Sequence, residues 1–130
     1  GDLIRAVMEG VTFSQRQCLD ILREMGAAPE TMTACGGGAR SAFWRQMLAD
    51  ALNCGIATSR LALEGPALGA AILAGVCSGV YGSVAADAIV TQDGLTTPRP
   101  GAAVKYEPYY ELYTKLYPAL SGAFGELAEL

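Results

Sequence analysis

The sequence predicts an α/β fold that is rich in helix and contains a short, mostly parallel sheet. The central observation is a β-like run at 31–35, followed by three glycines, a patterned helix at about 40–52 and a second β-like run at 56–58. Strand, helix and strand in this order are typical of a parallel βαβ unit. Helical patterns stand at both ends of the chain, and hydrophobic residues make up 52% of its 130 residues, enough for one buried core.

The first segment has the pattern of an amphipathic helix. Asp2 can cap its start, and Gly26 followed by Pro29 can end it. Between them, apolar residues recur with a period close to 3.6, so we expect this face to pack in the core. These residues are Leu3, Ile4, Val7, Val11, Cys18, Leu22 and Met25.

The glycine run 36–38 is the candidate functional turn. Glycine has no Cβ, so the chain can turn with positive φ and a ligand can come close to the backbone. A strand, a glycine turn and a helix start together bring backbone N–H groups toward a phosphate. The spacing does not fit the Walker A pattern, because no lysine follows at the required position. It does not fit G-x-G-x-x-G either, because Ser41 stands where that motif has its third glycine. A tight turn without a ligand therefore stays an open alternative.

The helix that follows this turn is expected to be buried on the face formed by Trp44, Met47, Leu48 and Ala51. Ser41 in its first turn can cap the helix or meet a ligand. Arg40 and Arg45 are interpreted as solvated surface charges or, for Arg40, as a ligand contact.

The stretch 65–77 is apolar or small on every side, which predicts a core helix that begins at Pro66. Glu64 before it can cap that helix or face the glycine turn. Ser83 is expected to cap a short helix that ends at Ala88.

The residues 91–104 are polar and contain glycine and proline, so they predict a surface loop. A last helix is expected to open at Pro108 and to be kinked or interrupted at Pro118. Its apolar stripe is interpreted as packing, and comprises Tyr109, Leu112, Tyr113, Leu116, Tyr117, Leu120, Phe124 and Leu127.

Composition argues against several classes of function. The formal net charge is −4 and lysine and arginine form no cluster, so nucleic acid is not expected as a partner. No apolar run is long enough to cross a bilayer, and the first residues lack the pattern of a signal peptide. The absence of histidine removes Ser-His-Asp and Cys-His mechanisms. Four cysteines without a C-x-x-C pair predict no zinc site and a reducing, cytoplasmic location.

The run from Gly36 to Asp50 resembles the C-terminal domain of sugar kinases of the FGGY type, the xylulokinases most closely. Asp2 to Val11 looks like the helix that precedes the glycine turn in that family, and Gly65 to Ala71 looks like its glycine-alanine helix. The resemblance implies an actin-like, ribonuclease-H-like ATPase domain. It also implies a kinase that moves the γ-phosphoryl of ATP, with Mg²⁺, onto a sugar hydroxyl, for xylulokinases that of D-xylulose to give D-xylulose 5-phosphate.

By the same resemblance, the ATP-binding residues are at the glycine turn and the helix start. The glycines would lie against the ATP phosphates, and the residues from Ala39 onward would border the adenine and ribose pocket. This predicted ATP site consists of Gly36, Gly37, Gly38, Ala39, Arg40 and Ser41.

The chain is short for this family, and we expect residues 1–130 to be a partial C-terminal domain without the N-terminal sugar-binding domain. The family's catalytic Asp, sugar contacts and metal ligands precede the matched region, so no catalytic or metal-binding residue is assigned here. A fragment of this kind is expected to be inactive alone, since phosphoryl transfer needs both sides of the cleft. None of the five aspartates is interpreted as the catalytic base: Asp2, Asp20, Asp50, Asp87 and Asp93.

Two alternatives stay open. Another FGGY kinase, acting on glycerol, gluconate, ribulose or fuculose, would carry the same nucleotide motif. A non-catalytic interaction domain would use the glycines for packing and the aromatic last helix for a partner, and a homodimer is possible because a partial domain exposes apolar surface.

Overall fold

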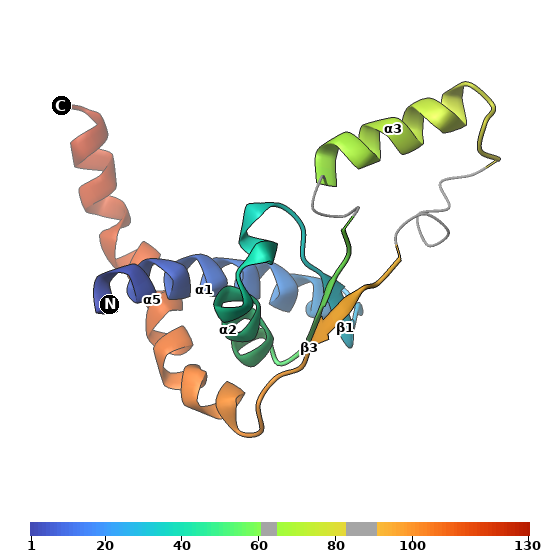
Figure 1. The fold of residues 1–130 in the computed structure, drawn as a ribbon. Coiled ribbons are helices and arrows are strands. Elements are labelled where there is room, and N and C mark those ends of the chain that lie inside the picture. Colours follow the sequence, from blue (N-terminus) through green and yellow to red (C-terminus); the bar gives the residue numbers. More distant parts are fainter. Residues whose placement is uncertain (61–64, 83–90) are drawn as a thin grey trace.

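The computed structural model describes residues 1–60, 65–82 and 91–130. Helices dominate, and three short strands form one sheet (Figure 1). The expected Ser83–Ala88 helix and Glu64 lie outside the described residues. The elements in chain order are α1 (Asp2–Glu24), β1 (Thr31–Thr33), the 3-10 turn η1 (Gly37–Arg40), α2 (Ala42–Leu52), β2 (Gly55–Thr58), α3 (Gly65–Cys77), β3 (Gly94–Thr96) and α5 (Ala102–Ala128).

The sheet has the order β1-β2-β3. β1 pairs with β2 in parallel, with Thr31 opposite Gly55, which confirms the predicted βαβ unit. β3 pairs antiparallel to β2, with Ile56 opposite Thr96, so the sheet is mixed. The prediction of a loop throughout 91–104 is therefore wrong for 94–96. This strand has only three residues, and its pairing comes from the free edge of β2 and not from an apolar alternation of its own.

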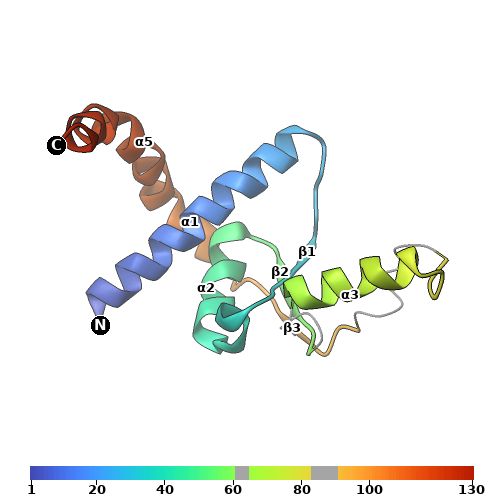
Figure 2. The same cartoon turned by 90° about the horizontal axis from the view of Figure 1, so that it is seen from above.

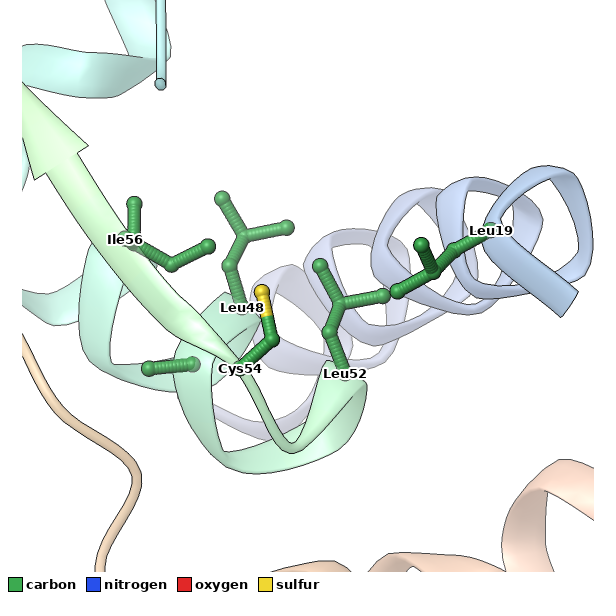
Figure 3. Close-up of a cluster of buried hydrophobic side chains, with 6 residues drawn as sticks. Leu19, Leu48, Leu52, Cys54 and Ile56 are labelled. Atoms are coloured by element: carbon green, nitrogen blue, oxygen red, sulfur yellow. The ribbon is translucent and has the colours of Figure 1, made fainter. Parts of the chain in front are cut away.

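α2 is the centre of the packing, because it contacts α1, α5 and β2. Figure 3 shows the main cluster, in which apolar side chains from α1, α2 and β2 point toward one another. The expected burial of Met47, Leu48 and Ala51 on α2 is confirmed. The cluster comprises Leu19, Leu48, Ala49, Leu52, Cys54 and Ile56, with Met32, Ala34 and Trp44 packed against it.

A second cluster joins α1, α2 and α5. Phe13 lies at its centre, buried beside Ala51 and Tyr110. The Phe13 ring centroid lies 5.7 Å from that of Tyr110 and 5.5 Å from that of Tyr113, distances at which aromatic rings interact favourably. The Arg16 guanidinium lies 3.9 Å from the centroid of the Tyr110 ring. This cluster fixes the first half of α5 across α1.

The apolar stripe of α1 is not in the core, contrary to the prediction. Leu3, Ile4 and Val7 are 81%, 69% and 63% exposed, and Met25 is 78% exposed. The opposite side of α1 carries the residues that α2 and α5 cover, namely Thr12, Phe13 and Leu19. Periodicity identifies an apolar face but not what covers it, and the described chain places nothing over this one. Asp2 is the first helical residue and not the cap, which is Gly1.

α3 also differs from expectation. Only Ile72 of this helix is buried, although its surface is apolar or small on every side. Figures 1 and 2 both show α3 standing apart from α1, α2 and α5. The composition of α3 indicates that it needs cover, and the described residues do not provide it. None of the described helices combines the length and the hydropathy that a membrane span requires.

α5 begins at Ala102, six residues before the predicted start at Pro108, and continues through both Pro108 and Pro118. The helix is not interrupted, but Figure 2 shows its two halves running in different directions, as the predicted kink requires. The expected packing of its stripe holds for Tyr113, which packs against Phe13, and is wrong for the rest of the stripe. Tyr110 is the large residue that α5 buries, whereas Tyr109, Leu112, Leu116, Tyr117, Leu120, Phe124 and Leu127 are between 44% and 73% exposed.

Candidate functional site

The glycine turn is a sharp corner between β1 and α2. Gly36 has φ 73° and ψ −172°, a conformation that side chains strongly disfavour. One 3-10 turn, Gly37–Arg40, follows, and α2 then begins at Ala42. The Ser41 hydroxyl accepts a hydrogen bond of 3.2 Å from the Trp44 backbone N–H, so the predicted helix cap is confirmed.

The three positions of the turn differ in why they require glycine. Gly36 is required by its positive φ. A Cβ on Gly38 would lie 3.2 Å from the Trp44 ring, so close packing explains that glycine. A Cβ on Gly37 would meet no described atom within 4 Å, and Gly37 has no positive φ. Neither backbone conformation nor packing among the described residues explains Gly37, and its exposed backbone remains open to a ligand.

Side chains of α2 hold the turn in place. The Arg45 guanidinium donates a hydrogen bond to the Ala39 carbonyl. The Trp44 ring lies under Gly38, and its indole N–H donates to the Thr12 hydroxyl at 3.4 Å. Sequence reasoning treated Arg45 as a surface charge and missed this role, because the 3-10 carbonyl that it binds is not visible in a residue pattern.

The turn lies at the carboxyl edge of the two parallel strands. Chain segments leave β1 and β2 there, and ligands bind at this edge in many α/β sheets. A Cβ on Gly65, the first residue of α3, would lie 3.5 Å from the Cβ of Cys35, so the start of α3 adjoins the turn. Ser59 follows β2, is 2% exposed, and its hydroxyl oxygen has no hydrogen-bond partner among the described residues.

The predicted ATP-site residues are therefore contiguous at one corner, with unequal access to solvent. Gly37 and Arg40 are exposed, Gly36, Gly38 and Ser41 are half-buried, and Ala39 is buried. The first N–H groups of a helix have no acceptor within that helix, so those of Gly37 and Gly38 are available to an anion. Such a corner can hold phosphate oxygens through the backbone, without a lysine.

A buried ion pair at the other end of α2 fixes the segment that leads into α5. Asp50 has no exposed surface. Its carboxylate accepts hydrogen bonds from the Arg99 backbone N–H at 2.8 Å and from the Arg99 guanidinium at 2.9 and 2.6 Å. Burial favours the neutral acid, but the hydrogen bonds from Arg99 outweigh it and hold the pKa of Asp50 below its ordinary value.

Two other described aspartates also accept hydrogen bonds. Asp20 accepts a hydrogen bond of 2.6 Å from the Tyr110 hydroxyl, and Asp93 accepts one of 2.9 Å from the Arg60 backbone N–H. Over residues 1–60, 65–82 and 91–130, acidic, cysteine and histidine side chains form no group of three or more that would suit a metal ion. The described part of the chain thus presents unpaired backbone N–H groups at the glycine turn and no metal-ligand cluster.

Comparison with known proteins assigns the family. Residues 1–78 match the family model described as the FGGY family of carbohydrate kinases, C-terminal domain. The xylulose kinase of Bacillus subtilis is 36% identical over 119 residues, which cover 88% of this chain and 23% of that protein. The solved ligand-bound xylulose kinase of Lactobacillus acidophilus superposes with a TM-score of 0.81 at 27% identity, covering 96% of this chain and 26% of that one.

The solved gluconate kinase of Lactobacillus acidophilus is nearly as similar, with a TM-score of 0.80 at 28% identity over 96% of this chain and 25% of that one. The chain spans about a quarter of the length of these relatives. The likeness to sugar kinases confirms the predicted actin-like ATPase fold, here as a helix-rich part with a small mixed sheet. From the matched family model and these relatives together, the chain belongs to the FGGY family of carbohydrate kinases.

Proposed function

We propose that this chain supplies part of the ATP site of a sugar kinase, with the turn Gly36–Ser41 against the phosphates of the nucleotide. The observation that carries the proposal is Gly37. Its neighbours Gly36 and Gly38 have local structural reasons to be glycine, whereas Gly37 has open space over it and an N–H at the start of a helical turn. A phosphate that approaches this backbone would explain why a side chain is missing there.

The substrate that we propose for the whole kinase is D-xylulose, converted to D-xylulose 5-phosphate with ATP and Mg²⁺. The support is the set of curated relatives named xylulose kinase, which are 32% to 44% identical to this chain. A specific observation keeps gluconate as a second candidate, because the gluconate kinase structure is as similar to this chain as the first xylulose kinase structure. Glycerol, ribulose and fuculose stay as further alternatives within the family.

We further propose that residues 1–130 form a partial C-terminal domain, and that the catalytic base, the sugar contacts and the Mg²⁺ ligands come from polypeptide outside them. Two observations support this: the chain spans about a quarter of its relatives, and the stripe of α1 and much of α3 are apolar but exposed. Large apolar faces of this kind are normally covered by protein. On this proposal the chain alone does not phosphorylate a sugar.

The remaining assignments follow the same proposal. We place the kinase in the cytoplasm, where ATP is available and where the free cysteines of this chain would stay reduced. Nucleotide and sugar are its proposed partners, with no nucleic acid and no membrane. We assign the exposed apolar faces of α1 and α3 to contacts with the rest of the kinase. The alternative is that a second copy of this chain covers them in a homodimer.

The experiment is a titration of the chain with ADP and Mg²⁺, followed by backbone amide chemical shifts. We expect the amide signals of residues 36–41 to shift with added ADP and to reach saturation. The variant Gly37→Ala should weaken ADP by at least about tenfold, because its methyl group occupies the phosphate position. Gly10→Ala is the matched control and should leave ADP affinity unchanged. A Cβ on Gly10 also meets no described atom within 4 Å, but Gly10 lies within α1 and not at the turn.

Equal ADP affinity of Gly37→Ala and the wild type would refute the phosphate role of the turn. If the chain shows no shifts at 36–41, Gly37→Ala is tested in the full-length kinase. An unchanged KM for ATP in that variant would refute the phosphate role of the turn. Sugar specificity is tested separately, by assaying the full-length kinase against xylulose, gluconate, glycerol, ribulose and fuculose.

A further inference from the structure

A cavity lies where the N-terminal half of α1, the segment before α5 and the first turns of α5 meet. Its volume is about 530 Å³. This falls within the range of small-molecule pockets, and it gives room for roughly fifteen water-sized groups. None of its lining residues belongs to the glycine turn or is used by the proposed kinase function. The chemistry-bearing residues of the lining are Arg5, Glu9, Arg99, Lys105, Tyr106 and Tyr109.

The lining is cationic although the whole chain is acidic. Three of these side chains are basic and one is acidic. The Asp50 carboxylate also binds Arg99, so the lining and this partner together carry one net positive charge in a chain of net charge −4. Fields of this kind concentrate anions at a concave surface. The apolar and aromatic part of the lining comes from the tyrosine rings, Pro100 and Ala102.

The two guanidinium groups are held in place and still have free donors. Arg5 uses its Nε to bind Glu9 at 2.8 Å. Arg99 uses its backbone N–H, Nε and Nη2 to bind the buried Asp50. Among the described residues, Arg99 Nη1 has no hydrogen-bond acceptor, and the Arg5 guanidinium adjoins the Tyr106 hydroxyl. An arginine whose orientation is fixed by one carboxylate loses less entropy when it binds a second anion.

Lys105 and the tyrosines complete the donor set. Lys105 is exposed on the first turn of α5 that faces this cavity, and no described carboxylate forms an ion pair with it. Tyr106 lines the cavity, and its hydroxyl can donate or accept a hydrogen bond there. No acidic residue occupies the first turn of α5, so that helix start adds positive potential.

We propose that this cavity binds a small organic phosphate, with the phosphate between Arg5, Arg99 and Lys105 and a ring against Tyr106 and Tyr109. A phosphomonoester carries close to two negative charges at neutral pH, and three basic side chains of the lining are placed to meet it. Guanidinium groups pair with phosphate oxygens in a bidentate manner. The cavity is larger than a phosphate ion alone requires, and the aromatic surface provides a place for the organic part.

The test uses phenyl phosphate as the probe, with inorganic phosphate and phenol as its two halves, at constant ionic strength. Backbone amide chemical shifts of the 130-residue chain report the binding site. The expected result is a saturable shift of residues 5, 9, 99, 102, 105 and 106 with phenyl phosphate, weaker binding of inorganic phosphate and no saturable shift with phenol. A response centred on 36–41 instead would assign the anion to the glycine turn and overturn the proposal.

The variant is Arg5→Gln with Lys105→Gln, because both side chains are exposed and neither supports the core. It should weaken phenyl phosphate by at least about tenfold. The matched control is Arg60→Gln with Lys115→Gln, which removes the same two charges outside the cavity and should change the affinity less than about twofold. Equal weakening by both double variants would show a nonspecific charge effect and overturn the proposal. Inorganic phosphate binding as tightly as phenyl phosphate would refute the organic ligand class.

Discussion

The buried carboxylate of Asp50 gives the sharpest stability prediction. All of its hydrogen-bond partners are donors: the backbone N–H and two guanidinium nitrogens of Arg99, and the Gln46 side-chain amide at 3.0 Å. Replacement by asparagine keeps the shape but substitutes an N–H₂ group for one oxygen. Whichever way the amide turns, this group meets donors, and two of the four hydrogen bonds are lost.

The expected cost of Asp50→Asn is about 2 to 3 kcal/mol in the free energy of unfolding. Hydrogen bonds to charged groups contribute roughly 1.5 to 3 kcal/mol each. The expected cost lies at or below the lower end of the sum for two such bonds, because the Arg99 side chain is 68% exposed and regains water when the carboxylate is lost. Asp93→Asn is the matched control: the Asp93 side chain is 39% exposed, its amide can turn its oxygen toward the Arg60 backbone N–H, and it should cost less than about 0.5 kcal/mol.

The assay is urea unfolding at neutral pH, followed by the fluorescence of the single tryptophan, Trp44. Acid provides a second readout. The pKa of Asp50 is lower in the fold than its ordinary value of 3.8, so its contribution is complete above that pH and is lost as the pH falls through the folded value. Asp50→Asn should lack this acid-dependent loss. A cost for Asp50→Asn that equals the cost of Asp93→Asn would refute the reasoning.

Two further predictions concern α5 and α1. Tyr110→Phe should destabilise the chain by about 1 kcal/mol, because it removes the hydrogen bond to Asp20. Burial and that hydrogen bond raise the pKa of Tyr110, so the wild type should lose stability as the pH rises above the ordinary value of 10.0, and urea unfolding of Tyr110→Phe should lack this part of the loss. The exposed stripe of α1 should make the chain self-associate, and Ile4→Ser with Val7→Ser should reduce this in sedimentation velocity. A wild-type chain that stays monomeric at every concentration would contradict the second prediction.

Local patterns predicted those elements whose formation depends on residues close in sequence. Three local features were sufficient to place the βαβ unit and the turn. They are the β-like run at 31–35, the glycines after it, and the spacing of Met47, Leu48 and Ala51. The Ser41 cap was also predictable, because a hydroxyl three residues before a helical N–H is a local relationship. The family followed from the same stretch, since its motif runs from Gly36 to Asp50.

Burial was predicted less well. Leu3 and Tyr117 have the periodicity of core residues, yet they are 81% and 73% exposed. An apolar stripe shows that a face will be covered by something, whereas the covering element is a property of the tertiary structure or of further polypeptide. β3 was missed for a related reason, because a three-residue strand is determined by the edge that it pairs with.

The sequence by itself therefore determined the helices α1 and α2, the parallel strands, the glycine turn and the membership in a kinase family. Only the tertiary structure decided which glycine of the turn is free for a ligand, since that depends on where the Trp44 ring lies. It also decided that the buried Asp50 pairs with Arg99, 49 residues away, and that Arg5 and Lys105 share a cavity. Periodicity and capping act over a few residues, whereas these contacts join segments that only the fold brings together.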